Sequence, residues 1–312
     1  MNLQQIIEQY ITFQQSLGTA FLTDARILRA FGRNRGTKAR IADVRPRHVD
    51  AFLGTIRPVT INWHDKLRRL RSFFHYAISR GYLAAAPLPT AIPKRPPPFV
   101  PYIFAHEELR RLFRAIDADA RKCSLEPTTM HVLILLLYGA GLRLREATNL
   151  TRADVDLHGS VLTIRNTKFG KTRLVPLGPQ LSQALTQYAA RTQARRADAP
   201  FFTTRAGTAV KPDNLQHNFR ILCNRAGIRR TDGTQEQPRL HDLRHTFAVH
   251  RLTSWYRQGA DVQRLLHHLS VYLGHVHIRH TQVYLKMTPE LLHEAGQRFE
   301  KYAKKEPCHA EI

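Results

Sequence analysis

Seven of the 17 prolines of this 312-residue chain lie within residues 87–101, which read PLPTAIPKRPPPFVP. Consecutive prolines fix the backbone and remove hydrogen-bond donors, so such a stretch favours an extended, semi-rigid spacer over a helix. The sequence therefore predicts two domains, at residues 1–86 and 102–303, joined by residues 87–101 as a linker. Residues 304–312 are expected to be a frayed tail.

The segment before the linker has the periodicity of helices. Apolar side chains recur at three- and four-residue spacing within residues 3–13, 49–56 and 67–78, which is the pattern of helices that bury one face. Pro46 lies where a helix can begin, because a proline in the first turn gives up no helical hydrogen bond. We therefore expect a helical N-terminal domain.

The segment after the linker is predicted to be mostly helical, with one small hairpin. Its apolar pattern predicts helices over residues 105–116, 128–150, 180–196, 214–226, 239–258 and 289–303. Residues 161–165 and 173–177 read as strands, and Phe169-Gly170 between them offers a turn. The predicted fold class is mainly α, with two domains and a small β-hairpin in the second.

Basic residues outnumber acidic ones two to one: 48 Lys and Arg stand against 24 Asp and Glu, and the net charge is +24. Residues 1–98 carry +11 of this charge and the remainder carries +13, so both domains are basic. An arginine-rich codon usage explains arginine in place of lysine, but it does not explain the excess over acids. A polyanion is the expected partner, and double-stranded DNA held between two basic lobes fits this distribution.

The chain has only three cysteines, which are far apart and form no CxxC pair. We therefore expect a reducing compartment and no disulfide framework. Residues 1–13 do not resemble a secretion signal, and the longest apolar stretch, around residues 131–142, is shorter than the roughly 20 residues that span a bilayer. A cytoplasmic protein without a membrane segment is expected.

Two motifs of the second domain are weak signals when each is taken alone. In GLRLRE, Arg143 and Glu146 are three residues apart, so an ion pair on a helix surface is the ordinary explanation. In TKFGKTR, at the hairpin turn, Lys168 and Lys171 are ordinarily solvated charges that protect a strand edge. The functional alternative is an ammonium group that a loop inserts into a DNA groove.

Two later motifs are equally weak alone. In HDLRH, His241 and Arg244 share one helical face, and such donors can bind two oxygens of one phosphate. The ordinary alternative is a capped helix start. In the next motif, YLGH, His275 precedes Tyr284 by nine residues, although a tyrosine on an amphipathic helix is ordinarily a core or rim residue.

Five motifs, taken in chain order, resemble those of the tyrosine recombinase/integrase family, the phage-integrase-like DNA strand transferases. They are GLRLRE, TKFGKTRLVPL, HDLRHTFA, YLGH and TQVYL. The resemblance covers residues 105–290, and the N-terminal segment resembles the family's core-binding domain in size, charge and position. It implies a site-specific DNA recombinase that clamps duplex DNA between its two domains. It further implies that no cofactor or metal is required and that a homotetramer assembles on two duplexes.

The resemblance also implies the roles of the site residues. Tyr284 is the nucleophile, which forms a 3′-phosphotyrosyl link and releases a 5′-hydroxyl. Arg143 and Arg244 neutralise charge on the phosphate and favour the phenolate of a side chain whose free pKa is about 10. Lys168 is implied to be the general acid, and His241 to assist proton transfer at the nucleophile. His275 is implied to donate a hydrogen bond to the phosphate, and Glu146 to orient Arg143.

Two departures from the family's pattern bear on these expectations. Thirty residues separate Arg244 from His275, a length that resembles the integrases carried on transposons and other mobile elements, so integration, excision or transposition is the expected reaction. The hairpin turn reads Lys-Phe-Gly-Lys, whereas Lys-Gly-x-Lys is the commoner pattern. We assign the general acid to Lys168 by its position relative to Arg143, and Lys171 stays the alternative.

Three alternatives compete with this interpretation. His275, His277 and His280, with His267 and His268 nearby, suggest a zinc site, but they lack a cysteine or carboxylate in a recognised ligand pattern, so no metal site is expected. A type IB topoisomerase-like nicking and closing activity shares the tyrosine chemistry. The third alternative is a DNA-binding factor without catalytic activity. The intact set of motif residues argues against it, because a DNA-binding factor has no need for a nucleophile.

Overall fold

The computed structural model describes residues 2–54, 60–97, 99–118, 125–165, 172–192, 196–232, 237–286 and 289–303. The chain divides into two compact units, Met1–Phe99 and Val100–Ile312, and each unit has a hydrophobic core of its own. The division falls inside the proline-rich segment. The domain limits given above, and the DNA-binding role of the first domain, stay predictions.

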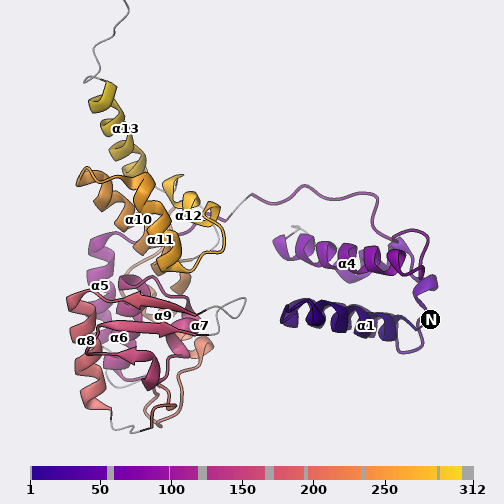
Figure 1. Cartoon of the computed structure of the whole chain (residues 1–312), viewed down its shortest axis with the longest axis horizontal. Coiled ribbons are helices and arrows are strands. Elements are labelled where there is room, and N and C mark those ends of the chain that lie inside the picture. The colour runs from indigo at the N-terminus through magenta and orange to yellow at the C-terminus, as the bar shows by residue number, and fades with distance from the viewer. Residues whose placement is uncertain are drawn as a thin grey trace, which may run out of the picture. The chain divides into compact units, whose positions relative to one another are not determined.

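The first unit is helical (Figure 1). It contains α1 (Leu3–Ser16), α2 (Leu22–Arg35), the 3-10 turn η1 (Ile41–Asp43), α3 (Pro46–Leu53) and α4 (Ile61–Ser79). Helix α1 begins at Leu3 because the side chain of Asn2 accepts a hydrogen bond of 2.8 Å from the backbone N–H of Gln4. Helix α3 begins at Pro46, as predicted, and ends at Gly54. Helix α2 was not predicted from the sequence.

The second unit is mostly helical as well. Its helices are α5 (His106–Asp117), α6 (Pro127–Gly139), α7 (Leu144–Thr148), α8 (Pro179–Arg191), α9 (Pro212–Arg225), α10 (Leu240–Arg257), α11 (Val262–Leu273), α12 (Arg279–Gln282) and α13 (Pro289–Ala303), with 3-10 turns η2 (Arg152–Asp154) and η3 (Val283–Lys286). The predicted fold class, mainly α with a small sheet, is confirmed. Helix α11 occupies the long spacing between Arg244 and His275 and was not predicted as a helix.

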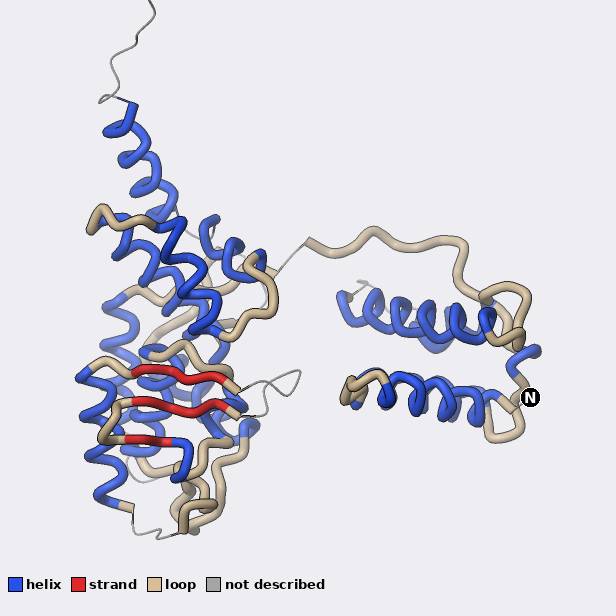
Figure 2. Tube along the Cα trace, in the orientation of Figure 1, coloured by secondary structure: helices blue, strands red, loops and turns tan. Residues whose placement is uncertain are grey.

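A small antiparallel sheet lies in the second unit (Figure 2). Its strands, β1 (Val155–Asp156), β2 (Val161–Ile164) and β3 (Arg173–Pro176), are paired in the order β1-β2-β3. The predicted hairpin is the pair β2 and β3, in which Ile164 lies opposite Arg173. The short strand β1 was not predicted. The register places Arg173 at the first position of β3, two residues after Lys171.

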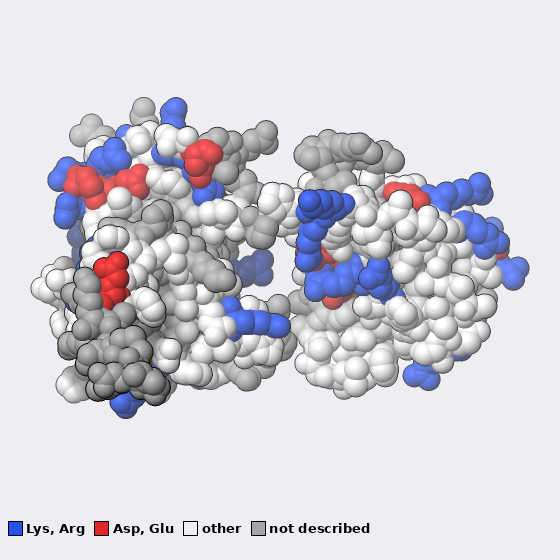
Figure 3. Space-filling view, turned by 90° about the horizontal axis from the view of Figure 1, so that it is seen from above, with Lys and Arg blue, Asp and Glu red and all other residues white. Residues whose placement is uncertain are grey.

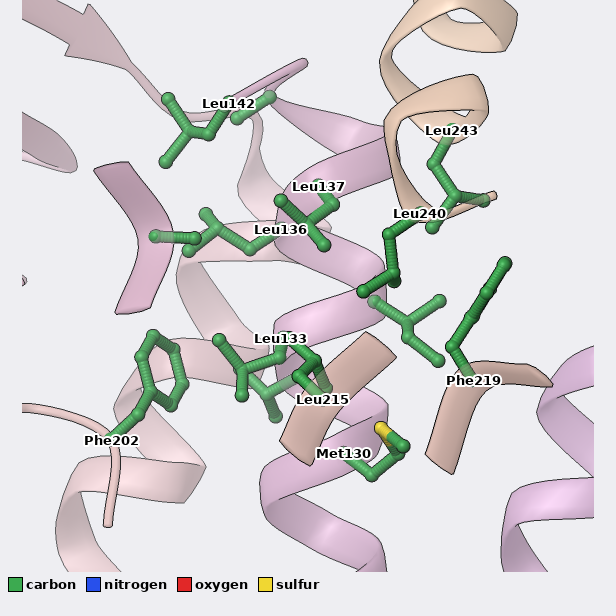
Figure 4. Packing of buried hydrophobic residues seen from close by; sticks show 14 of the residues in the cluster. Met130, Leu133, Leu136, Leu137, Leu142, Phe202, Leu215, Phe219, Leu240 and Leu243 are labelled. Carbon is green, nitrogen blue, oxygen red and sulfur yellow. The ribbon is translucent and has the colours of Figure 1, made fainter. Parts of the chain in front are cut away.

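Helix α6 is the central element of this unit. Its side chains pack against α9, α10 and the segment around Phe202, as Figure 4 shows for Met130, Leu133, Leu136, Leu137, Leu215, Phe219, Leu240 and Leu243. Burial on all sides explains why α6 is apolar around its whole circumference. No helix within the described part of the chain is both long and apolar enough to cross a bilayer.

The prediction of a single helix over residues 128–150 is wrong. Helix α6 ends at Gly139, and α7 begins again at Leu144. Between them Gly141 has a φ of 59°, a left-handed conformation that favours glycine. A Cβ atom at Gly141 would lie 2.5 Å from Cδ1 of Phe247. A side chain at this position would collide with α10, so the turn between the two helices requires glycine. This tertiary contact is invisible in the apolar periodicity.

Candidate active site

The family's motif residues come from distant segments and meet in the second unit. Arg143 lies at the N-cap of α7, His241 and Arg244 lie in the first two turns of α10, and Tyr284 lies in η3. His275 follows the end of α11. Lys168 and Lys171 lie outside the described residues, so their assignment stays a prediction.

Arg143 and Glu146 form the expected ion pair, but not on a helix surface. The Nη1 of Arg143 donates to Oε1 of Glu146 over 2.7 Å, and the backbone N–H of Arg143 donates to Oε2 over 2.9 Å. The carboxylate therefore caps the start of α7 and holds the guanidinium at once. The Glu146 side chain is only 9% exposed, which makes this a structural junction.

Arg173 joins the same carboxylate and was missed by the sequence analysis. Its Nη1 and Nη2 donate to Oε1 and Oε2 of Glu146 over 2.9 and 2.8 Å. A signal for this contact exists in the sequence. In Arg-Leu-Val the arginine shares a face with Val175, which is buried, whereas Leu174 points to solvent. An arginine in the inward register of a strand indicates a buried partner.

The charge state of Glu146 follows from these contacts. Burial alone would raise the pKa of its carboxyl, but the hydrogen bonds from Arg173 and Arg143 outweigh burial and lower the pKa to about 2. Glu146 is therefore an anion throughout the physiological range. It neutralises part of the positive charge that two guanidiniums bring into a confined space.

Arg244 is a fully buried arginine, with 1% of its surface exposed. Its Nη1 donates to the carbonyl oxygen of Gly141 over 2.6 Å, and its Nη2 donates to that of Leu273 over 2.7 Å. Burial, with the nearby charge of Arg143, lowers the pKa of Arg244 to about 10. The guanidinium thus keeps its charge at neutral pH.

The end of α11 gathers three arginines. The carbonyl oxygens of Tyr272, Leu273 and Gly274 are consecutive. They accept hydrogen bonds from Nε of Arg173 at 3.0 Å, Nη2 of Arg244 at 2.7 Å and Nη2 of Arg143 at 2.9 Å, in that order. The last carbonyls of a helix have no partner within it, and they form the negative end of its dipole. The helix end therefore satisfies its own acceptors with the guanidiniums of the site.

Tyr284 is buried beside these groups, with 3% of its surface exposed. Its ring stacks on His275 at a centroid distance of 6.1 Å and lies 5.5 Å from the ring of His245. Burial raises the pKa of the Tyr284 phenol, while Arg244 and Arg143 act in the opposite direction. Burial wins in this state, so the phenol is protonated at neutral pH.

His275 and His241 are both held neutral. Nδ1 of His275 and Oγ1 of Thr281 lie 2.7 Å apart, and burial, with the charges of Arg244 and Arg143, lowers the pKa of His275 to about 3. His241 reaches the solvent, but the protein around its ring and the charges of Arg244 and Arg239 lower its pKa to about 4. Both imidazoles are therefore neutral at neutral pH, and each then has one N–H donor and one acceptor nitrogen.

His245 is a second residue that the sequence analysis missed. Its ring lies 4.8 Å from that of His241 and faces Tyr284, and its Nδ1 is buried without a hydrogen-bond partner in the described structure. Burial, followed by the neighbouring charged groups, lowers its pKa to about 3. The spacing of His241 and His245, one helical turn, placed them on one face and was the available signal.

The histidines of the alternative zinc hypothesis do not form a compact cluster. The ring of His280 lies 6.1 Å from that of His275 and 5.8 Å from that of His277. Across the residues that the structure describes, three or more His, Cys, Asp or Glu side chains are nowhere grouped as metal ligands. The expectation of a metal-free site stays a prediction.

The chain is similar to known proteins in both sequence and fold. The sequence pattern of the phage integrase family matches residues 103–290. A protein of Sinorhizobium fredii named as an integrase/recombinase, y4rB, is 39% identical over 247 residues, which cover 77% of this chain and 78% of that protein. The tyrosine recombinase XerA of Thermococcus onnurineus is 30% identical over 236 residues, covering 74% and 73% of the two chains.

A solved structure shares the fold. The integrase of the transposon Tn1549, solved with transposon right end DNA, superposes with a TM-score of 0.67 over 97% of this chain and 100% of that chain, at 18% identity. The likeness of fold agrees with the family match and with the sequence relatives. The resemblance inferred from the motifs is thus confirmed, and the chain belongs to the phage integrase family, the tyrosine-type site-specific DNA recombinases.

Proposed function

We propose that this recombinase cleaves and rejoins DNA strands through a covalent 3′-phosphotyrosyl intermediate on Tyr284. The observation that carries the proposal is the position of Tyr284. Its ring lies against His275 and His245 and beside the charge of Arg244, all within one chain. A buried tyrosine beside a phosphate-binding set of arginines has the chemistry of a nucleophile rather than that of a packing residue.

The proposed step conserves the phosphodiester bond. The Tyr284 oxygen forms a bond to phosphorus, the bond between phosphorus and the 5′-oxygen breaks, and the 3′ end stays attached to the protein. The phenol proton passes to His241, and the leaving 5′-oxygen takes a proton from Lys168, or from Lys171 as the alternative. A 5′-hydroxyl of a partner strand then attacks the same phosphorus and releases Tyr284.

The fixed guanidiniums supply the electrostatic part of this step. Arg143 and Arg244 are held by the carbonyl oxygens of Gly274, Leu273 and Gly141 before any DNA binds. Preorganised charges need no rearrangement as negative charge develops on the phosphate oxygens. They also stabilise a phenolate, and this offsets the burial that keeps Tyr284 protonated in the DNA-free protein.

His275 is suited to donate a hydrogen bond to the phosphate. Its Nδ1 is engaged with the hydroxyl of Thr281. In a neutral imidazole that accepts at Nδ1, the proton resides on Nε2. Thr281 is fully buried, so this contact holds the ring in one orientation. The second nitrogen is then a donor for a non-bridging oxygen of the scissile phosphate.

The proposed substrate is double-stranded DNA of a mobile element. The net charge of +24 favours a polyanion, and Lys and Arg side chains reach the surface of both units in Figure 3. The structure of similar fold is an integrase solved with transposon end DNA. Strand exchange joins two duplexes and therefore four cleavage points, so we propose that four copies assemble, and that they act in the cytoplasm.

The test is covalent trapping. Wild-type protein is incubated with a pool of random-sequence duplexes that carry a nick, so that cleavage near the nick releases a short fragment with a 5′-hydroxyl end and the strand cannot be resealed. Trapped DNA is recovered by denaturing gel and sequenced, which also identifies the site. Tyr284→Phe should bind the selected duplex but trap none. Trapping that survives Tyr284→Phe would show that another residue is the nucleophile.

A further inference from the structure

We infer that Arg173 is a positioning residue of this active site, which sets the geometry of Arg143 and of the His275 loop without itself binding the phosphate. The inference rests on the function proposed above, because it assigns a role within that same site. It assigns a role to a residue that lies within the hairpin motif TKFGKTRLVPL but received no role from the sequence.

All three nitrogens of the Arg173 guanidinium donate to protein acceptors. Two go to the carboxylate of Glu146, at 2.9 and 2.8 Å, and Nε goes to the carbonyl oxygen of Tyr272 at 3.0 Å. The side chain is 11% exposed. Both Nη atoms of Arg173 pair with a carboxylate, so its charge is already neutralised by an anion. Arg244, in contrast, donates to neutral carbonyl oxygens and keeps its charge available for a phosphate.

Arg173 reaches the phosphate-binding group through Glu146. The same carboxylate oxygen, Oε1, accepts from Nη1 of Arg173 and from Nη1 of Arg143. Fork-to-fork pairing of an arginine and a carboxylate fixes the plane of the carboxylate. The plane of Glu146 in turn fixes where Arg143 points, so the first residue of β3 determines the orientation of a side chain on α7.

Arg173 also supports the backbone that leads to His275. Gly274 has a φ of 68°, and a Cβ atom there would lie 2.8 Å from Nη1 of Arg173. The guanidinium thus packs directly against the turn that ends α11, while Nε bonds the carbonyl of Tyr272. Removing it frees both the carboxylate and the helix end, on which Arg143 and Arg244 depend.

A matched pair of substitutions tests the inference. Arg173→Lys keeps the charge but cannot span two carboxylate oxygens and a carbonyl. Arg165→Lys makes the same change at the residue that directly follows β2. There the arginine is 57% exposed and pairs with Asp154 rather than with Glu146. Both variants are assayed on the duplex selected by trapping, for the dissociation constant and for the single-turnover rate of covalent complex formation.

We expect Arg173→Lys to slow covalent trapping by about 10- to 100-fold, because a misplacement of about 1 Å can cost that much. Its DNA dissociation constant should change by less than about threefold, since the guanidinium makes no phosphate contact in this assignment. Arg165→Lys should keep the trapping rate of the wild type. A rate for Arg173→Lys equal to that of wild type would overturn the inference, and so would a loss confined to DNA affinity.

The pH profile separates positioning from a merely structural role. The charged and titratable groups that face Glu146 are Arg143 at the start of its own helix, Arg173 on β3, and Arg244 and His241 on α10. Of the interactions that keep the carboxyl ionised, the hydrogen bonding from Arg173 is the largest.

Loss of Arg173 therefore lets the pKa of the buried Glu146 carboxyl rise. We expect the acid limb of the trapping rate to move to higher pH in Arg173→Gln and to stay in place in Arg165→Gln. A shared acid limb for the two variants would contradict an action through Glu146.

A measurement without DNA keeps the inference separable from the proposed function. A double-mutant cycle of Arg173→Lys and Glu146→Gln, read as free energy of unfolding in urea, reports their coupling in the free protein. Strong coupling together with no trapping by the wild type would refute the phosphotyrosyl proposal and leave the contact intact. Coupling within error of zero would overturn the positioning role, whatever the wild type does with DNA.

Discussion

The Nη1 of Arg244 donates a hydrogen bond of 2.6 Å to the carbonyl oxygen of Gly141, a residue 103 positions earlier in the chain. Gly141 lies in the break between α6 and α7, two residues before Arg143. One backbone oxygen therefore links the two arginines that are assigned to the same phosphate. The break in the helix is thus part of the site.

Substitution of Gly141 should damage both stability and cleavage. Gly141→Ala places a Cβ atom 2.5 Å from Phe247 and 2.9 Å from Leu273, at a φ of 59°. Left-handed strain and crowding together should lower the free energy of unfolding by about 2–4 kcal/mol. Urea denaturation measures this. Gly207→Ala is the control, since Gly207 has a φ of 75° but open space around it; equal losses at both positions would show that crowding plays no part.

Arg244→Lys should lose both activity and stability. A lysine cannot serve the carbonyl oxygens of Gly141 and Leu273 together, and an unsatisfied buried acceptor costs about 1–3 kcal/mol of unfolding free energy. Loss of the bidentate guanidinium should lower the trapping rate by about 100-fold or more. Arg251→Lys on the exposed side of α10 should change stability by less than about 0.5 kcal/mol. Trapping by Arg244→Lys at the wild-type rate would remove Arg244 from the mechanism.

The fold was largely predictable because its signals are local. Amphipathic periodicity located most of the helices, and the change of period between residues 161 and 177 located the hairpin. The break at Gly141 was not predictable, because the ring of Phe247 that packs against this turn comes from another helix. Periodicity records which face of a segment is buried, and it does not record where a distant element forces the backbone to turn.

The site was predictable only as far as its motifs reach. The ordered motifs singled out Arg143, Arg244 and Tyr284, which the fold brings together, and their catalytic roles stay predictions. Arg173 and His245 escaped because their importance lies in contacts, with Glu146 at 2.8 Å and with Tyr284 at a ring distance of 5.5 Å. A residue that acts by holding another is recognised from its partners, which only the fold supplies.

Stability should fall as the pH drops below 6.5, because His245 and His275 are held neutral in the folded protein. The pKa of each is lowered from 6.5 to about 3, mainly by burial. The unfolded chain therefore takes up protons that the folded protein does not, and the loss continues until the pH nears the folded pKa values. Between pH 7 and 5.5 we expect about 2 kcal/mol less unfolding free energy.

Most of this dependence belongs to two named residues, and His241, whose pKa is lowered to about 4, adds to it. His245→Gln with His275→Gln should reduce the decline between pH 7 and 5.5 by more than half, as measured by urea denaturation at each pH. His267→Gln with His268→Gln, on the exposed face of α11, should leave it unchanged. Glu146 does not contribute in this window, because its pKa of about 2 in the folded state and its ordinary value of 4.5 both lie below it. A decline of the same size in all three proteins would assign it to other groups.

The choice between Lys168 and Lys171 as general acid can be settled by the leaving group. A 5′-phosphorothiolate at the scissile position replaces the 5′-oxygen by sulfur, and a thiolate leaves without a proton because its pKa lies far below that of an alcohol. Lys168→Ala should therefore cleave the normal duplex slowly and the sulfur-substituted duplex at close to the wild-type rate. Lys171→Ala should show little change on either substrate. Arg143→Ala, which removes charge neutralisation rather than a proton, should stay slow on both. Rescue of Lys171→Ala in place of Lys168→Ala would transfer the role to Lys171, and rescue of neither would mean that the proton reaches the leaving oxygen from another group.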